Sequence, residues 1–425
     1  MEGIEAIDTI GSLVVILIVC FAMGRIMLSI GMPRVLGEMI GGIMMGPTCL
    51  GLFYPELMAG LFTAETKSVL SVIGTIGVGL YMFLIGMELN VKRSSSLLEV
   101  GKVTAAGFLV PFAFGLLAAL YLHDTLAAGI PIGQFAFFMA IAVSITSIPM
   151  LARILEEKNL HSSPLGQLTI LAASLDDLGA WFLLTILIAA TQSTGTIGNR
   201  FGQILMAIGM IVMLYVVVKP LLRRFVRTAQ GTDTMNEGML GIVLLAILSV
   251  AWLSELIGIT SVIGCFLLGT IMPDAAPVQR MIDERLKGLV TSLFIPVYFV
   301  HAGLKADLRS LLQVELLIPF GILLGVSFFG KYLGCSLTMR KMGYSWRDSS
   351  ALGGLMNAKG LMGLVIAELG LELGYVSQPV YSLLVLTAIA TTALSIVVYK
   401  LSTRLPHPGI RGAASVMPPG ELAKQ

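Results

Sequence analysis

Charged side chains are scarce in this sequence. Only 12% of its 425 residues are Asp, Glu, Lys or Arg, and 56% are hydrophobic. Soluble globular proteins carry about 25% charged residues, so this composition excludes a water-soluble fold of this length. Because one membrane-spanning helix needs roughly 20 apolar residues, we expect an all-α integral membrane protein.

Other features are also missing. The net charge is only +2, which gives no electrostatic reason to expect a nucleic-acid partner. No CxxC pair or metal-ligand spacing joins the four cysteines, so we expect small apolar side chains and no cofactor. The acidic N-terminus lacks the basic region of a secretory signal, so the first hydrophobic run is expected to remain as a helix. No Gly-rich dinucleotide fingerprint follows residue 403, so we expect no nucleotide-binding domain, only a disordered tail at 404–425.

Apolar runs separated by short polar segments predict thirteen transmembrane helices within residues 1–403. They lie near 9–30, 34–50, 67–90, 100–122, 134–156, 165–191, 202–222, 237–256, 259–273, 284–303, 314–336, 349–371 and 379–400.

Basic residues concentrate in every second loop. The opposite loops hold only Lys67, Arg200, Lys305 and Arg309. Because cytoplasmic loops carry the excess of Lys and Arg, we expect the N-terminus outside and the C-terminus in the cytoplasm, in the cell inner (plasma) membrane. The alternation also favours an odd number of spans.

Two adjacent carboxylates, Asp176 and Asp177, lie near the middle of the sixth predicted span. An ionisable residue within a span is a functional hypothesis by default. Neighbouring helical residues point about 100° apart, so one carboxylate can have a structural partner while the other faces a cavity. Because burial favours the neutral carboxyl, such a group can hold either a proton or a cation. The alternative is that both are neutral or paired structural groups.

Two spans contain residues that predict a broken helix. Ser144, Thr146 and Ser147 precede Pro149 in the fifth span, and a proline removes a backbone donor from the helix. An ordinary proline kink is the alternative here.

The twelfth span contains four glycines, Asn357 and Lys359, with Gly360 directly after the lysine. We expect a second break, with Lys359 near the end of a half-helix, where a cation is stabilised. Small-residue helix packing is the alternative here.

Lys331 in the eleventh span is expected to pair with Asp176 or Asp177, or else to extend toward the lipid headgroups.

Glu88 ends the third span, and the sequence leaves open whether it pairs with Lys359 or only ends the helix. His301 and Glu255 lie near span ends and are expected at the membrane interface.

The two breaks lie seven spans apart, and this spacing predicts an internal repeat. It makes spans 1–6 equivalent to spans 8–13, with the seventh as a linker. An odd offset inverts the second half relative to the first, so we expect two inverted six-helix repeats. Broken helices at corresponding positions of two halves indicate a transporter binding site.

Seven short segments in this order resemble the monovalent cation:proton antiporter superfamily, over roughly residues 10–400. The resemblance is closest to its second family, which contains bacterial Na⁺(K⁺)/H⁺ exchangers, glutathione-gated potassium effluxers and plant cation/H⁺ exchangers. The segments are Pro33–Glu38 with Gly46-Pro47, Phe83–Leu89, Ser144–Pro149, Asp176-Asp177, Gly264–Gly269, Ile295–Val300 with Gly303-Leu304, and Asn357–Gly360.

The resemblance implies a homodimer whose mobile core slides against a dimerisation domain, with helices 5 and 12 crossed. We assign the spans near 67–191 and 284–371 to the core. By the same resemblance Asp177 is the carboxylate shared by proton and cation, Asp176 pairs with Lys331, and Thr146 neighbours the ion. Many relatives have Arg where this chain has Lys359.

Three other membrane functions fit the sequence less well. An intramembrane aspartyl protease would carry its carboxylates on separate helices, and a channel would need a selectivity filter. A sodium-coupled symporter of an organic anion on a similar inverted-repeat fold is the serious alternative. The sequence leaves the choice between Na⁺ and K⁺ open.

Overall fold

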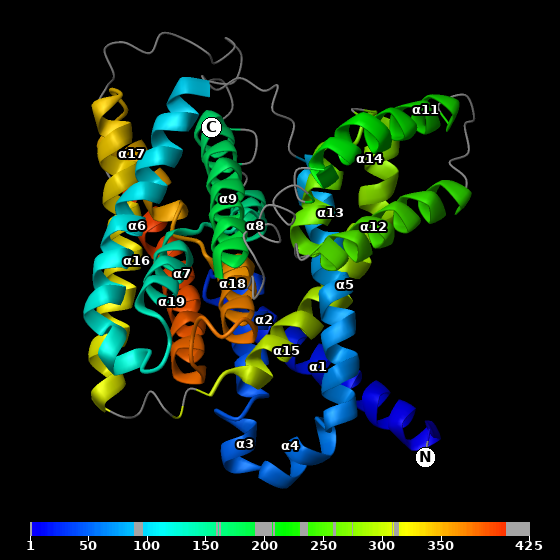
Figure 1. Cartoon of the computed structure of the whole chain (residues 1–425), viewed down its shortest axis with the longest axis horizontal. Helices are drawn as coiled ribbons and strands as arrows, with labels where there is room; N and C mark the ends of the chain where they lie inside the picture. The colour runs from blue at the N-terminus through cyan, green and yellow to red at the C-terminus, as the bar shows by residue number, and fades with distance from the viewer. Residues whose placement is uncertain are drawn as a thin grey trace.

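The computed structural model describes residues 2–88, 97–158, 160, 163–191, 206, 209–229, 237–257, 261–273, 275–307, 309 and 314–404. Within these ranges the regular structure is helical, without a strand (Figure 1). Nine helical segments there are long and apolar enough to cross a membrane. The predicted all-α, multi-span architecture is therefore confirmed.

The nine segments agree in position with nine of the predicted spans. They are Ile7–Ser29, Ala64–Met87, Leu98–Leu126, Pro164–Ile188, Gly238–Ile257, Val278–Lys305, Glu315–Lys341, Trp346–Glu372 and Gln378–Thr403.

The count of thirteen spans stays a prediction. At the second, fifth and ninth predicted spans, α2 (Arg34–Met44), α7 (Ile132–Ser144) and α13 (Ser261–Thr270) have only 11, 13 and 10 residues. A helix perpendicular to the membrane needs roughly 20 residues. The seventh predicted span, 202–222, and the predicted tail lie partly outside the described residues.

The helix contacts divide most of the fold into two groups. The α9 group packs around α6 and α16 and consists of α6 (Leu97–Leu126), α7, α8 (Ile148–Glu157), α9 (Pro164–Thr191), α16 (Val314–Lys341), α17 (Trp346–Leu355), α18 (Gly360–Glu372) and α19 (Gln378–Thr403). The α5 group consists of α1 (Glu2–Ser29), α2, α5 (Ala64–Glu88), α12 (Glu237–Ile257), α13 and α15 (Ile295–Lys305).

The remaining described elements are short or lie at the edge of these groups. They are α3 (Leu50–Phe53), α4 (Pro55–Leu61), η1 (Leu214–Val218), α11 (Lys219–Ala229), α14 (Ala276–Ile282), η2 (Asp283–Lys287) and η3 (Val290–Phe294). Figure 1 shows the α9 group on the left, α11 to α14 on the right, and α2 and α15 between them.

This grouping differs from the predicted division at three helices. The prediction placed α5 and α15 with α9, and left α19 outside that unit. Instead α5 packs on α13, α15 packs on α2 and α5, and α19 packs on α17 and α18. Glycines explain the close α2–α15 contact, because a Cβ added at Gly42 would overlap the carbonyl of Phe299, and one at Gly303 would overlap Gly42.

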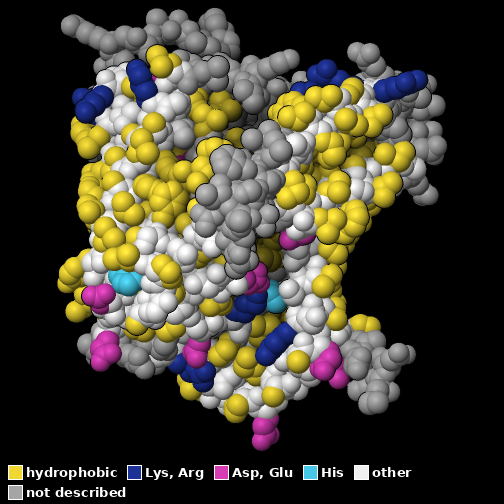
Figure 2. Space-filling view, in the orientation of Figure 1, with side chains coloured by type: hydrophobic (Ala, Val, Ile, Leu, Met, Phe, Trp, Pro, Cys, Tyr) yellow, Lys and Arg dark blue, Asp and Glu magenta, His cyan; other side chains and the backbone are white. Residues whose placement is uncertain are grey.

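Burial separates the interior helix from the outer ones. All of an apolar 18-residue stretch within the broken segment Trp346–Glu372 is buried. In Ile7–Ser29, only 22% of the corresponding stretch is buried. Figure 2 accordingly shows hydrophobic side chains over much of the molecular surface. The broken segment therefore lies inside the protein, and α1 presents an apolar surface suited to lipid.

Candidate functional site

The fifth predicted span is broken, as expected. α7 ends at Ser144, residues 145–147 are not helical, and α8 begins at Ile148. Pro149 is the second residue of α8, where the missing N–H of a proline leaves no hydrogen bond unmade. The chain therefore unwinds just before the proline and can restart a helix with it.

The twelfth predicted span is also broken, between Leu355 and Gly360. Gly360 has a φ of +36°, and its N–H donates to Oγ1 of Thr392 at 3.0 Å. A Cβ at this position would lie 2.6 Å from Cε of Met150 in α8. Only glycine therefore fits here without a shift of its neighbours.

The two breaks contact each other. The N–H of Ser147 donates to the carbonyl of Ala358 at 2.8 Å, and the Thr146 hydroxyl donates to the carbonyl of Met356 at 2.8 Å. The side-chain amide of Asn357 donates to the carbonyl four residues earlier, at 2.9 Å. Unwound backbone at membrane depth needs such partners, and here each break supplies them to the other.

Lys359 is held at the end of α7. Its ammonium donates to the carbonyls of Val143 and Ile145 at 2.5 and 3.0 Å, and the side chain is buried. The last carbonyls of a helix carry partial negative charge, which a cation stabilises, so the predicted position is confirmed. Glu88 is the last residue of α5, and its side chain lies outside the described part of the chain.

Lys331 and Asp176 form a buried ion pair. Nζ of Lys331 lies 2.5 Å from Oδ2 of Asp176, and both side chains are fully buried. The same ammonium also donates to the carbonyl of Ser144, whose hydroxyl donates to the carbonyl of Ala140 at 2.7 Å. The pairing implied by the family resemblance is therefore present, and Lys331 does not extend toward the headgroups.

Asp177 has a different environment. It is 1% exposed, and neither of its carboxylate oxygens has a hydrogen-bond partner among the described residues. The charged groups that act on it are Asp176 and Lys331, which already form a pair. A buried carboxylate without a partner is unfavourable as an anion, so this position suits a group that alternates between a bound proton and a bound cation.

A second cluster of ionisable groups was not predicted. Lys305 of α15 lies 2.5 Å from Glu368 and 3.2 Å from Glu372 of α18, and Nε2 of His301 lies 3.2 Å from Glu368. We call these four residues the His301 cluster. It adjoins a cavity of about 140 Å³, lined also by Glu255. In Figure 2, acidic, basic and histidine side chains lie together below the centre of the view.

The His301 cluster lies at the junction of the two helix groups. His301 is buried and faces Glu368 across that junction. Its expected position at the membrane interface stays a prediction. The sequence contained one signal for this cluster, the spacing of its residues. His301 and Lys305 are four residues apart at the end of one helix, and Glu368 and Glu372 are four residues apart at the end of another. Each pair therefore shares one helix face.

Another ionic contact between the two helix groups centres on Glu38. Glu38 of α2 is fully buried, 2.9 Å from Arg34 and 3.8 Å from Arg153 of α8. Among the described residues, no group of three or more His, Cys, Asp or Glu side chains is arranged to hold a metal ion.

The sequence and the fold are similar to those of known proteins. The family profile described as "Sodium/hydrogen exchanger, transmembrane" matches residues 13–400. The chain is 33% identical to the Na(+)/H(+) antiporter NhaS4 of Synechocystis sp. over 91% of this chain and 95% of that protein. It is 31% identical to cation/H(+) antiporter 17 of Arabidopsis thaliana and 29% identical to K(+)/H(+) antiporter 1 of Saccharomyces cerevisiae, over 87% and 88% of this chain.

The chain spans only 45% and 44% of those plant and yeast proteins. A solved structure of the sodium proton antiporter MjNhaP1 from Methanocaldococcus jannaschii at pH 8 is similar in fold. The TM-score is 0.67, with 16% identity, over 94% of this chain and 99% of that one.

Proposed function

The chain belongs to the sodium/hydrogen exchanger family of multi-pass membrane proteins, and we propose that it exchanges a monovalent cation for protons at Asp177. The observation that carries the proposal is the contrast between the two adjacent carboxylates. Asp176 is neutralised by Lys331, while Asp177 is buried without a hydrogen-bond partner among the described residues.

This contrast supports competition between the two ions. Asp176 cannot easily release Lys331, because the pair is completely buried and separating it would leave two charges unpaired. Asp177 is neutral when it carries a proton and is compensated when it carries a cation. One site then serves both ions in turn, which couples their movements in opposite directions.

The crossed breaks would complete the site. Ser144, Thr146 and Ser147 present hydroxyl and carbonyl oxygens, which are the ligands that hard cations prefer. The Thr146 hydroxyl donates to Met356 and also interacts with Asp176, so it joins the crossing to the carboxylates. Lys359 neutralises the end of α7, and Asn357 and Gly360 keep the second segment unwound.

Alternating access would follow from movement between the two helix groups. We propose that the α9 group is the mobile core, since it contains both breaks and both aspartates, and that the α5 group forms the dimerisation domain of a homodimer. The contacts between the two groups include α15–α18, α2–α19 and α5–α8. The remaining elements of the proposal are an elevator motion, thirteen spans in inverted repeats, and an inner-membrane location with the N-terminus outside.

Either Na⁺ or K⁺ fits the proposal. The Synechocystis relative is named as a Na⁺/H⁺ antiporter and the yeast relative as a K⁺/H⁺ antiporter. These relatives give no support to the organic-anion symporter that the sequence left open.

A proteoliposome assay tests the function. Acid-loaded vesicles containing a pH dye receive Na⁺, K⁺, Li⁺ or choline, with wild type, Asp177→Asn and Asp124→Asn compared. Asp124 is the matched control because its carboxylate is fully exposed, beside His123. We expect cation-specific proton efflux that is lost in Asp177→Asn and kept in Asp124→Asn.

Two results would overturn the proposal. One is the absence of efflux with any cation from pH 6 to 9. The other is undiminished efflux in a properly folded Asp177→Asn variant, which would place exchange at another group.

A further inference from the structure

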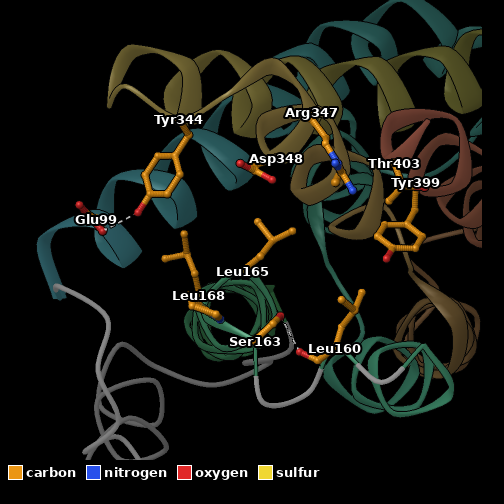
Figure 3. Close-up of a pocket in the computed structure, with 12 residues that line it drawn as sticks. Glu99, Leu160, Ser163, Leu165, Leu168, Tyr344, Arg347, Asp348, Tyr399 and Thr403 are labelled. Carbon is orange, nitrogen blue, oxygen red and sulfur yellow. Dashed lines mark hydrogen bonds between the residues drawn. The ribbon is translucent and has the colours of Figure 1, made fainter. Parts of the chain in front are cut away.

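A second cavity, of about 420 Å³, lies apart from the crossed breaks. Its walls come from α6, α9, α17 and α19 and from the turn between α8 and α9 (Figure 3). None of the residues that line it belongs to the transport site proposed above. Pockets for small ligands have volumes of about 300–1,000 Å³, so the cavity is large enough for a ligand of its own.

One cation faces this cavity without a partner. The half-buried Arg347 guanidinium forms no hydrogen bond or ion pair with another described residue. The Tyr399 hydroxyl beside it also has no hydrogen-bond partner in the described part of the chain. Figure 3 shows both side chains on the same side of the cavity. A planar guanidinium with free donors suits a phosphate or carboxylate.

The wall also contains two carboxylates, and both keep their negative charge because their hydrogen-bond donors are neutral hydroxyls. Glu99 accepts a hydrogen bond from the Tyr344 hydroxyl at 3.0 Å, and Figure 3 shows this pair on the side opposite Arg347. Asp348 accepts from the Ser345 hydroxyl at 2.7 Å. Arg347 is the one cation among the described lining residues, so an anion is most favourable on the side near Arg347 and Tyr399.

Most of the remaining lining is apolar, apart from Ser163 and Thr403. Leu160, Leu165 and Leu168 form one wall and leave room for a hydrocarbon chain. Nearby, Trp346 is 50% exposed, and the Arg340 guanidinium lies 5.7 Å from its ring. Tryptophan and basic side chains together are typical of the membrane–water interface.

We propose that this cavity binds a phosphate ester that carries an apolar chain. The phosphate lies against Arg347 and Tyr399, and the chain lies along Leu160, Leu165 and Leu168. An anionic phospholipid and a soluble phosphate ester share this chemistry. The bound molecule joins α9 and the α8–α9 turn to α17 and α19, so it stabilises the α9 group.

The test is ligand binding by the full-length, delipidated protein in a zwitterionic detergent. Thermal stabilisation and native mass spectrometry compare dihexanoyl phosphatidylglycerol, glycerol 3-phosphate and dihexanoyl phosphatidylcholine. We expect saturable binding of phosphatidylglycerol, weaker binding of glycerol 3-phosphate, and none of the zwitterionic lipid. Arg347→Gln weakens phosphatidylglycerol binding by about 10- to 100-fold, the range for a lost charged hydrogen bond, and Tyr399→Phe weakens it by a smaller factor.

Lys341→Gln is the matched control, because Lys341 is an exposed cation near Arg347 that does not line the cavity. It should bind phosphatidylglycerol as wild type does. Equal, Arg347-dependent binding of glycerol 3-phosphate would support the phosphate contact but would overturn the proposed contact between an apolar chain and the leucines.

The proposal is overturned if neither phosphate compound binds saturably, or if folded Arg347→Gln binds as tightly as Lys341→Gln. Should Arg347→Gln fail to fold, Tyr399→Phe gives the same decision: undiminished binding in that variant overturns the proposal. Because no ion gradient is needed, these results are independent of whether the chain exchanges cations for protons.

Discussion

Nζ of Lys331 in α16 lies 2.5 Å from Oδ2 of Asp176 in α9, 155 residues away in sequence, and neither side chain is exposed. The same ammonium donates to the carbonyl of Ser144 at the end of α7. Three helices of the α9 group therefore meet at one buried charge. Removing either partner leaves the other charge inside the protein without compensation.

Single substitutions of this pair should be strongly destabilising. We expect Lys331→Met and Asp176→Asn each to lower the free energy of unfolding by about 3–5 kcal/mol, the usual cost of an uncompensated buried charge. The double variant should be much more stable than the sum of the two losses predicts. A double-mutant cycle of thermal unfolding in detergent measures the difference.

Lys341→Met serves as the control for loss of a lysine, since Lys341 is exposed at the end of the same helix. It should leave stability nearly unchanged. Strictly additive effects of Lys331→Met and Asp176→Asn would show that the two residues do not act as a pair.

Gly360 should not tolerate a side chain. Its φ of +36° is unfavourable for other residues, and a Cβ would meet Met150 at 2.6 Å. We expect Gly360→Ala to reduce stability by about 1–3 kcal/mol for the backbone alone, and further for the overlap. Thermal unfolding and proteoliposome transport measure both consequences.

Gly374→Ala separates these two contributions. Gly374 has a φ of +71°, but a Cβ added there would have no neighbouring atom within 4 Å, so only the backbone cost applies. Equal losses for Gly360→Ala and Gly374→Ala would contradict the argument that Met150 limits the space.

Competition at Asp177 predicts how transport depends on pH. Because a proton on the carboxylate excludes the cation, the apparent KM for the cation should rise as pH falls. Saturating cation should restore the rate, since it displaces the proton. Initial rates in proteoliposomes, measured at equal pH on both sides and varied cation concentration, test this. An apparent KM that stays constant from pH 6 to 9 would argue for separate cation and proton sites.

The local features of the site could be predicted from the sequence. Pro149 and the glycines around Gly360 disfavour a continuous helix, so both breaks were predicted from residue type, with a proline kink and small-residue packing as the alternatives. Residue type alone could not decide between them, because Pro111 and Pro319 lie inside the continuous helices α6 and α16. The adjacent Asp176 and Asp177 had to face different surroundings because of the helical repeat. Which of them pairs with Lys331 came from the family resemblance, and the structure agrees with it.

Contacts between distant helices could not be predicted in the same way. The place of α5, α15 and α19 in the two groups depends on how closely their backbones approach, and hydropathy does not contain that information. The pairing of His301 and Lys305 with Glu368 and Glu372 requires two helix ends to meet. Sequence spacing could place each pair on one helix face, but it could not identify the opposite face.

The contact between Lys305 and Glu368 offers a direct test of the proposed elevator motion. Lys305 belongs to α15 of the α5 group and Glu368 to α18 of the α9 group, and their charged atoms are 2.5 Å apart. If the groups slide during transport, this contact must open in every cycle. Cysteines at both positions, joined by a short reducible bis-thiosulfonate linker, should therefore stop exchange in proteoliposomes, and a reductant should restore it.

The background for this experiment is Cys49→Ser, because Cys49 is the one partly exposed cysteine and the other three are buried. Each single-cysteine variant, treated with the same reagent, controls for modification without a cross-link and should keep transporting. A fully cross-linked protein that exchanges at the rate of the reduced one would mean that α15 and α18 stay together throughout the cycle. The moving boundary would then have to lie elsewhere, and the assignment of α18 to a mobile core would be wrong even if Asp177 carries the ions.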